Sequence, residues 1–354
     1  MEKILITGGC GFIGSNLAVM FLERGYHVTC FDNLSRSGSE KLLKRVLDCG
    51  CEYVHGDIRV AEDFEKLHPS YDVMIECSAE PSVLVGSRGT DAKYIIDSNL
   101  LGAVNCFEYC RRRGTPILFL SSSRVYPYDR INSLKFVETD TRFELAEGSE
   151  GVRPQGISLE FPLDGLRTLY GATKLCCEVL LREYSANFGI PVVVDRCSVV
   201  AGPWQLGRVD QGVFTHWLVS HLYKKDLEYI GFGGTGKQVR DLLHIDDLGE
   251  LILKQIKVVR QQKFAVFNVG GSVTSNLSLC EASRLCSEIT GNKISVGSSL
   301  ANRAGDIAWY VSDNAQVEKA YNWKPRRTAR DVLQDTYKWL MAHENQFKDL
   351  FGGG

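Results

Sequence analysis

Tyr170 and Lys174 are the two side chains of this sequence whose types and spacing most directly suggest chemistry. They are four residues apart in Tyr-Gly-Ala-Thr-Lys, so on a helix the phenol and the ammonium lie on one face. A free tyrosine loses its proton only near pH ~10 and is a poor base at neutral pH. A fixed positive charge beside it favours the phenolate, which suits general acid–base catalysis. A single Y-x-x-x-K is more often a helix tyrosine with a solvated lysine, so the catalytic interpretation depends on what the rest of the chain supplies.

A glycine-rich loop after the first predicted strand, Lys3–Thr7, indicates a dinucleotide site. The glycines that form G-x-G-x-x-G and the wider G-x-x-G-x-x-G are Gly8, Gly9, Gly11 and Gly14. They allow a tight turn and a close approach of the backbone to a pyrophosphate, whose charge lies at the N-terminus of the next helix. Asp32 ends a second predicted strand that begins at His27. A carboxylate there binds an adenosine ribose and repels a 2′-phosphate, which favours NAD over NADP.

Strands and helices then alternate, which predicts an α/β fold with a Rossmann-type, doubly wound parallel sheet. The predicted strands are Glu52–His55, Asp72–Cys77, Pro116–Leu120 and Pro191–Cys197, and the predicted helices include Asn99–Arg113 and Tyr170–Phe188. Ligands of such sheets lie beyond the carboxyl ends of the strands. Both the glycine loop and the serine run 121–123 fall there.

The expected domains are an NAD-binding Rossmann domain over residues 1–200 and a smaller α/β substrate lobe over 201–350, some of whose segments return to the first domain. Leu134–Leu169 is polar and predicts a long surface loop. Gly231–Asp241 is glycine-rich and carries two cations, and it is either a hairpin turn with solvated charges or a clamp on an anionic substrate. Ser278 and Glu281 form a capping-box pattern for a later helix.

The composition excludes several classes of protein. A net charge of −2 provides no basic field for a nucleic acid or an anionic membrane. No apolar run approaches the ~20 residues that span a bilayer, and no signal peptide precedes the first strand, so a cytoplasmic protein is expected. Twelve cysteines include no C-x-x-C and no zinc-ligand spacing, so we expect no metal site and interpret most of them as small buried apolar residues.

Together these motifs resemble the extended short-chain dehydrogenase/reductase family over nearly the whole chain. Its members are mostly nucleotide-sugar epimerases and dehydratases with tightly held NAD. The resemblance implies Ser122, Tyr170 and Lys174 as the catalytic residues, with Ser122 at a position that is often Thr. The implied cofactor-binding residues are Gly8, Gly11, Phe12, Ile13, Gly14, Asp32, Asn33, Ser35, Arg36, Asp57, Ile58, Ala79, Asn99, Tyr170 and Lys174.

Four stretches are more similar to the members that invert C2 of CDP-paratose: 79–84, 122–126, 210–212 and 236–241. A CDP-linked deoxyhexose is therefore the implied substrate. The substrate-binding residues this implies are Pro81, Ser82, Ser123, Arg124, Gln211, Gln238, Arg240 and Arg303. Glu80 stands where the family usually has an amide.

Three other functions compete with this interpretation. A 4-epimerase acting on a UDP-hexose uses the same three catalytic residues. A 4,6-dehydratase needs an acid pair where this chain has Ser123 and Arg124, so it is disfavoured. A non-enzymatic nucleotide sensor predicts a broken catalytic set. The resemblance also implies a homodimer or homotetramer that pairs through the helices 99–113 and 170–188, and it assigns no role to Cys176 or Cys177.

Overall fold

The computed structural model describes residues 2–82, 91–146, 148–207 and 212–351, and this part of the chain divides into two compact units. Unit 1 comprises residues 1–125, 169–196 and 249–267, and unit 2 comprises residues 126–168, 197–248 and 268–354. The passage from unit 1 to unit 2 after Arg196 lies near the expected boundary at residue 200. Residues 126–168 belong to unit 2, and residues 249–267 return to unit 1.

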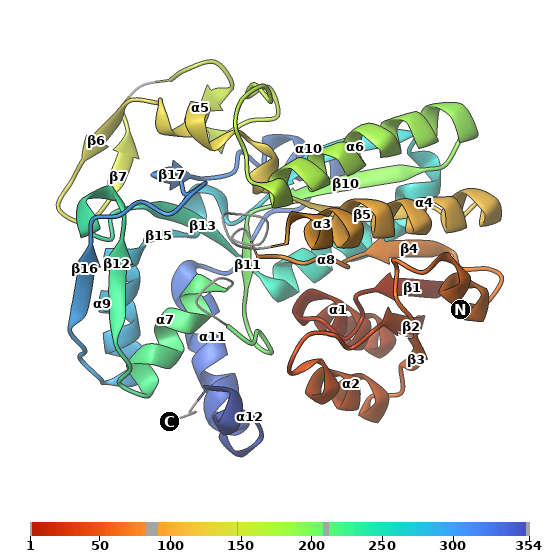
Figure 1. The fold of residues 1–354 in the computed structure, drawn as a ribbon, viewed down its shortest axis with the longest axis horizontal. Helices are drawn as coiled ribbons and strands as arrows, with labels where there is room; N and C mark the ends of the chain where they lie inside the picture. Colours follow the sequence, from red (N-terminus) through yellow and green to blue (C-terminus); the bar gives the residue numbers. More distant parts are fainter. Residues whose placement is uncertain (1, 83–90, 147, 208–211, 352–354) are drawn as a thin grey trace. The chain divides into compact units, whose positions relative to one another are not determined.

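A seven-stranded sheet forms the centre of unit 1 (Figure 1). Its strands, in spatial order, are β14 (Phe264–Val269), β10 (Val192–Cys197), β5 (Ile117–Ser122), β4 (Val73–Glu76), β1 (Lys3–Thr7), β2 (His27–Asp32) and β3 (Glu52–His55). The neighbours from β3 to β5 pair in parallel, and the strand order reverses between β1 and β4. The predicted doubly wound parallel sheet is confirmed, and the reversal marks the edge at which such sheets bind ligands.

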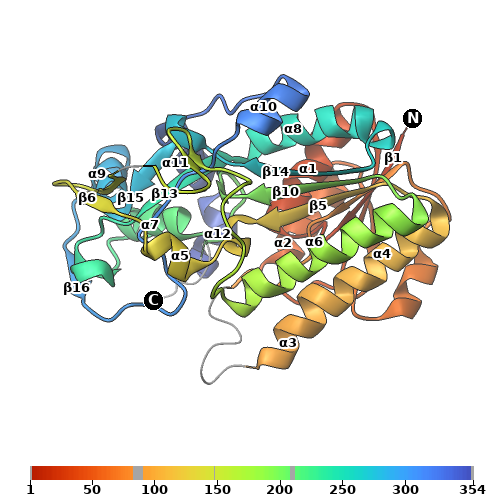
Figure 2. The same cartoon turned by 90° about the horizontal axis from the view of Figure 1, so that it is seen from above.

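Helices cover both faces of this sheet, which explains why its central strands β1, β4 and β5 are almost entirely buried and mostly apolar. The helices are α1 (Phe12–Glu23), α2 (Ser39–Asp48), α3 (Ala92–Ile96), a π-helical turn (Asp97–Leu101), α4 (Gly102–Arg113), α6 (Leu169–Phe188) and α8 (Ile245–Val258), with short 3-10 turns at Ala61–Lys66, Ser123–Val125 and Val259–Gln261. Figure 2 shows α4 and α6 on one side of the sheet and α1 and α8 on the other. The helix expected from Asn99 therefore begins earlier, because α3 and the π-helical turn precede α4.

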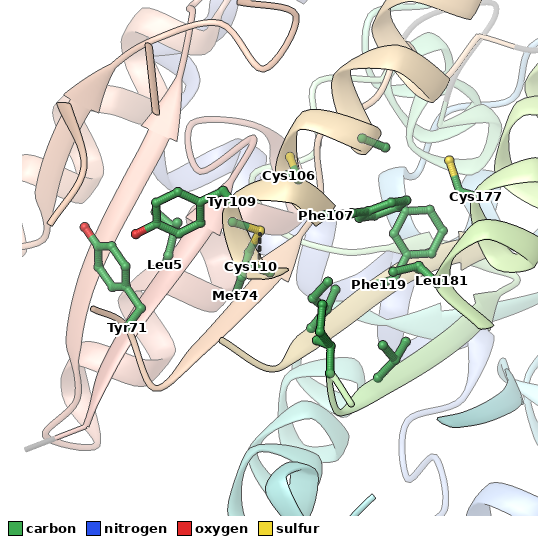
Figure 3. Close-up of a cluster of buried hydrophobic side chains, with 14 of the residues drawn as sticks. Leu5, Tyr71, Met74, Cys106, Phe107, Tyr109, Cys110, Phe119, Cys177 and Leu181 are labelled. Carbon is green, nitrogen blue, oxygen red and sulfur yellow. Dashed lines mark hydrogen bonds between the residues drawn. The ribbon is translucent and has the colours of Figure 1, made fainter. Parts of the chain in front are cut away.

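A buried cluster fixes α4 and α6 on the sheet (Figure 3). The ring of Phe107 on α4 meets the ring of Phe119 on β5 edge to face, with 5.9 Å between the ring centres. Leu181 of α6 is fully buried in the same cluster. Burial of side chains of this size contributes roughly 1.5–3 kcal/mol each. The helix that carries Tyr170 and Lys174 is thus packed directly on the strand that ends at Ser122.

Unit 2 contains a second, smaller sheet with helices packed on it. The sheet has the order β11 (Val199–Ala201), β13 (Val239–His244) and β15 (Asn276–Ser278), with β17 (Trp309–Tyr310) also paired to β13. Its helices are α5 (Tyr128–Asn132), α7 (Val213–Leu222), α9 (Leu279–Thr290), α10 (Ala315–Tyr321), α11 (Ala329–Ala342) and α12 (Glu344–Phe351), and a further strand pair joins β12 (Leu227–Ile230) to β16 (Val296–Ser299). The capping box predicted for the helix after Ser278 is confirmed, with Ser278 and Glu281 bonding reciprocally at the start of α9.

Two expectations for unit 2 are corrected. Residues 134–169 are not wholly irregular, because they form two antiparallel pairs, β6 (Phe136–Glu138) with β7 (Phe143–Leu145) and β8 (Val152–Arg153) with β9 (Gly156–Ile157). Strands of two or three residues are too short to give a visible alternation in the sequence. The glycine-rich stretch 231–241 is a turn only in its first part, through the 3-10 turn Phe232–Gly234, and β13 begins at Val239.

Three further properties concern the whole described part of the chain. None of its helices combines the length and apolarity needed to cross a membrane. None of the twelve cysteines, all of which are described, forms a disulfide. Within the same residues, no group of three or more His, Cys, Asp or Glu side chains is arranged to hold a metal ion.

Candidate active site

The glycine loop between β1 and α1 is closed too tightly for larger residues. Gly8 has a φ of +65°, and a Cβ on Gly14 would lie 2.2 Å from the Gly8 carbonyl oxygen. The same carbonyl accepts a hydrogen bond from the Gly11 amide at 3.0 Å. Phe12 and Ile13 then begin α1, whose first N–H groups have no partners within the helix. The loop and the helix start form a cradle for a phosphate group.

Asp32 connects the glycine loop to the end of β2. Its carboxylate accepts hydrogen bonds from the Cys10 amide at 3.0 Å and from the Leu34 amide at 2.8 Å. Burial raises the pKa of Asp32, and the backbone hydrogen bonds from Leu34 and Cys10 oppose that rise. A carboxylate has about four lone-pair sites, so Asp32 retains acceptor capacity for a ribose.

Asp57, one of the implied cofactor-binding residues, is already engaged by neighbouring side chains. Arg59 donates from Nε and Nη2, the latter at 2.6 Å, and Asn33 donates from Nδ2 at 3.0 Å. The hydrogen bonds from Arg59 lower the pKa of Asp57 to about 2, so its charge is present at neutral pH. Asn33 also accepts from the Ser35 amide, and Arg36 follows directly in the same segment. The segment after β2 and the segment after β3 are thus tied together.

The loop after β4 is held by Asn99 of the π-helical turn. The Asn99 side chain accepts from the Glu80 amide at 2.7 Å and donates to the Glu80 carbonyl at 3.0 Å. The Glu80 carboxylate accepts from the Ser82 amide at 3.0 Å. Glu80, the departure noted in the sequence, therefore shapes the loop that contains Ala79 and Pro81. Asn99 braces this loop with its side chain.

Ser122 ends β5 beside the start of α6. It is 8% exposed, and its hydroxyl oxygen accepts from the Arg124 amide at 3.1 Å. Ser123 and Arg124 continue as the 3-10 turn. A Cβ on Gly171 would lie 2.0 Å from the Arg124 carbonyl oxygen, so only glycine lets α6 approach this turn. Gly171, the residue after Tyr170, therefore packs against the 3-10 turn that follows Ser122.

Lys174 lies buried on the inner face of α6. Its ammonium is 3.6 Å from Glu76 Oε2 and 4.5 Å from the centre of the Phe119 ring. Burial alone lowers the pKa of Lys174, but the charges of Glu76 and Tyr170 outweigh burial and the pKa is raised. Tyr170 is thus near enough to Lys174 for its charge to act there, and the catalytic pairing of the two side chains stays a prediction. Sequence reasoning missed Glu76, which was only one residue within the predicted strand Asp72–Cys77.

A buried ion pair joins α6 to the sheet one turn beyond Lys174. Arg196 of β10 donates to Glu178 from Nε at 3.1 Å and from Nη2 at 2.7 Å. The Ser121 hydroxyl donates to the same carboxylate at 2.5 Å. Three elements, β5, α6 and β10, are thus linked at the residue next to Ser122. Sequence reasoning missed this link as well, because its members lie on separate elements.

The implied substrate-binding residues Arg240 and Arg303 lie in unit 2. Arg240 donates to Asp306 at 2.7 Å and to the Ile307 carbonyl at 2.6 Å. Arg303 precedes Asp306 by one short turn, in which its carbonyl accepts from the Asp306 amide. The structure therefore brings Arg240 to the segment that carries Arg303. Gln238 is buried and donates to the Ile230 carbonyl, and Gln211 lies outside the described residues.

Ile58, another of the implied cofactor-binding residues, contacts α4. The Ile58 carbonyl accepts from the Asn105 side chain at 2.8 Å, and a Cβ on Gly102 would meet the Ile58 side chain at 2.7 Å. Ile58 therefore packs closely on the start of α4. Cys177 of α6 is buried and donates to the Asn99 carbonyl at 3.3 Å, whereas Cys176 is exposed.

Comparison with known proteins settles the family. A family model described as the NAD dependent epimerase/dehydratase family matches residues 4–270. The chain belongs to this family. The expected resemblance and the NAD cofactor are thereby confirmed, and the glycine cradle that a Cβ would fill fits a pyrophosphate.

Individual relatives within the family have different substrates in their names. CDP-paratose 2-epimerase of Salmonella typhi is 31% identical and aligns with 96% of this chain and 99% of its own length. UDP-glucose 4-epimerase of Corynebacterium glutamicum is 25% identical, with 96% of each chain covered. The solved UDP-glucuronic acid 4-epimerase of Bacillus cereus, in complex with UDP-glucuronic acid and NAD, is 23% identical, with a TM-score of 0.76 over 96% of this chain and 99% of that one. These similarities support a nucleotide-sugar epimerase with a Rossmann fold.

Proposed function

We propose that this protein inverts C2 of a CDP-linked deoxyhexose, converting CDP-paratose to CDP-tyvelose. The observation that carries the proposal is the 31% identity to a CDP-paratose 2-epimerase along nearly the full length of both chains. The four stretches that resemble such enzymes add support, as does the presence of Ser122, Tyr170 and Lys174.

The chemistry follows from the carbon that is inverted. C2 carries an ordinary hydroxyl and has no neighbouring carbonyl in the substrate, so its C–H bond is not acidic and deprotonation cannot invert it. NAD, when bound, supplies a hydride acceptor and donor that makes C2 trigonal and then restores it from the other face. The protein must provide a base, an orienting hydroxyl and a firm hold on the rest of the substrate.

Tyr170 is the base in this proposal. Its phenolate takes the proton of the C2 hydroxyl and later returns it, while the Ser122 hydroxyl orients that oxygen by a hydrogen bond. The Lys174 ammonium stabilises the phenolate by charge. Gly8, Gly11 and Gly14 with Asp32 hold the cofactor's pyrophosphate and ribose.

Arg240 and Arg303 are proposed to hold the diphosphate. Charge-assisted bonds from Arg to phosphate are strong and directional. Binding energy concentrated on the nucleotide diphosphate leaves the sugar free to turn over between oxidation and reduction. The Arg240–Asp306 contact would fix the guanidinium before the substrate arrives.

A UDP-hexose 4-epimerase is the second candidate. The similarity to UDP-glucose 4-epimerases at 25% identity over 96% of both chains favours it. The same tyrosine, lysine and serine would then act on the C4 hydroxyl.

Proton NMR of the purified protein with CDP-paratose, without added cofactor, tests the proposal. The coupling between the anomeric and C2 protons reports inversion at C2, and turnover without added NAD shows that the cofactor is retained. A parallel sample with UDP-glucose detects inversion at C4 through the appearance of UDP-galactose. Turnover of UDP-glucose alone would replace the proposal by the 4-epimerase, and Tyr170→Phe is the inactive control for either reaction.

A further inference from the structure

Glu76 is a carboxylate at the ligand-binding edge of the sheet. It is the last residue of β4, where it pairs with Thr7 at the end of β1 and with Phe119 of β5. Its side chain is 0% exposed, no hydrogen bond of ordinary geometry reaches either carboxylate oxygen from the described residues, and only weaker contacts come from Ser78 and Lys174. A buried carboxylate so weakly hydrogen-bonded is costly unless a charge compensates it. The Lys174 ammonium, 3.6 Å from Oε2, is that charge.

Lys174 needs the same compensation. Its side chain is 3% exposed, and a buried ammonium with no counter-charge gives up its proton readily. A neutral amine would not stabilise a phenolate at Tyr170. The Phe119 ring at 4.5 Å offers a favourable π face but no negative charge.

The thiols near Lys174 do not supply this charge, and Tyr170 supplies one only as the phenolate that Lys174 must itself stabilise. Tyr170 and Cys177 face it from α6, and Cys77 faces it from the segment after β4. Cys106 of α4 also lies within electrostatic reach of Glu76 and Lys174. Burial raises the pKa of Cys177 to about 12 and also raises the pKa values of Cys77 and Cys106, so these thiols are neutral near pH 7.

We propose that Glu76 is a positioning residue that holds the Lys174 ammonium charged and in place beside Tyr170. The inference rests on the role proposed above for Tyr170 and Lys174, whichever sugar carbon is inverted. Glu76 fixes Lys174 from the sheet, while α6 presents it next to the tyrosine. Glu76 and Lys174 together also set the pH range of the reaction. The negative charge of Glu76 offsets part of the effect that the positive charge of Lys174 has on the pKa of Tyr170.

The opposing possibility is that Glu76 is protonated. Burial raises the pKa of Glu76, and the charge of Lys174 opposes that rise. If Glu76 is neutral, it gives Lys174 no counter-charge. Replacing Glu76 by an uncharged glutamine would then leave the titration midpoint of Lys174 unchanged. The two possibilities therefore predict different titrations of Lys174.

The titration of Lys174 can be followed in the full-length, NAD-loaded protein labelled with 13Cε-lysine. The Lys174 signal is the one that disappears in Lys174→Arg. We expect Lys174 to stay charged from about pH 6 to 9 in the wild type. In Glu76→Gln its midpoint should fall by about one pH unit or more, an approximately tenfold rise in the acid dissociation constant. A Lys174 that is neutral at pH 7 in the wild type, or an unchanged midpoint in Glu76→Gln, would overturn the proposal.

Asp195→Asn is the matched control. Asp195 is another fully buried carboxylate of unit 1, on β10, two strands from β4, and it accepts from Gln255 at 2.9 Å. Above about pH 7, the range in which Lys174 is expected to titrate, the control removes a buried charge from the same sheet, and it should leave the Lys174 midpoint unchanged. An equal shift in both variants would show a general effect of lost buried charge and would also overturn the proposal.

The pH profile of turnover gives a second readout. Glu76→Gln removes negative charge near Tyr170, so the acid limb of kcat/KM, which reports phenolate formation, should move to lower pH. The alkaline limb, where Lys174 loses its charge, should move to lower pH as well. A residue with only a structural role would lower the profile without moving its limbs, and that result would contradict the proposal. Because the lysine titration requires no substrate, an incorrect substrate assignment leaves this test intact.

Discussion

The buried Glu178–Arg196 pair should be a principal attachment of α6 to the sheet of unit 1. The two side chains are 5% and 7% exposed, and the carboxylate accepts from both Arg196 and Ser121. Glu178→Gln removes the negative charge and leaves the guanidinium buried in unit 1. Loss of one partner of a buried pair costs about 3–5 kcal/mol. The glutamine amide oxygen can still accept one hydrogen bond, so we expect a loss of about 3 kcal/mol in the free energy of unfolding.

An exposed pair in the same unit provides the comparison. Lys44 and Asp48 on α2 are 2.7 Å apart but 76% and 61% exposed. Asp48→Asn should therefore change the free energy of unfolding by at most about 1 kcal/mol. Replacement of both buried partners, Glu178→Met with Arg196→Leu, should recover much of the lost stability, because no charge is then left buried.

Urea unfolding followed by far-UV circular dichroism measures these differences. Tryptophan fluorescence is unsuitable, because all five tryptophans lie in unit 2. Hydrogen exchange of the α6 amides should increase in Glu178→Gln and stay unchanged in Asp48→Asn. If Glu178→Gln costs no more than Asp48→Asn, the pair does not hold α6 and this reasoning is refuted.

Three further predictions concern single residues of unit 1. Gly171→Ala places a Cβ 2.0 Å from the Arg124 carbonyl oxygen, so α6 must shift. We expect kcat to fall at least about tenfold, and an unchanged kcat would contradict this prediction. Gly14→Ala places a Cβ 2.2 Å from a carbonyl oxygen of its own loop, so the purified protein should lose its NAD, measured by cofactor release on denaturation. Gly25→Ala is the control: its φ of +84° makes the substitution cost some stability, but it lies outside the glycine loop with no neighbour within 4 Å and should retain NAD. Burial raises the pKa of Asp195 to about 7, so the folded protein holds this proton more tightly than the unfolded chain does. Wild-type stability should therefore fall relative to Asp195→Asn as the pH rises from about 4 to about 7, and parallel urea midpoints across that range would contradict the assignment.

Local sequence patterns predicted much of the fold of unit 1, but few of the side-chain contacts that hold the candidate site in place. The first strand, Lys3–Thr7, has the predicted bounds, because a continuous apolar run ending in glycines is a local signal. The capping box at Ser278 likewise depends on residues only three apart. Glu76 gave no such signal, because its partner Lys174 reaches it only once α6 packs on the sheet.

The ion pairs in both units likewise join residues of separate helices and strands, which come together only when the chain folds. Glu178 and Arg196 lie on a helix and on the strand that follows it, and nothing in either segment alone predicts that they meet. Arg240 and Asp306 are brought together from positions 66 residues apart. The sequence could indicate Arg240 as a cation for an anionic substrate. It could not indicate that the Asp306 carboxylate forms an ion pair with that side chain.

The fate of a deuterium at C2 tests the central claim most directly. The purified protein is incubated in ordinary water with CDP-paratose that carries deuterium at C2, and the product is followed by NMR. Transient oxidation by a retained cofactor predicts CDP-tyvelose with the deuterium still at C2, because the same hydride returns to the opposite face. Inversion with loss of the deuterium to solvent, or no inversion at C2 while UDP-glucose is converted to UDP-galactose, would contradict the account.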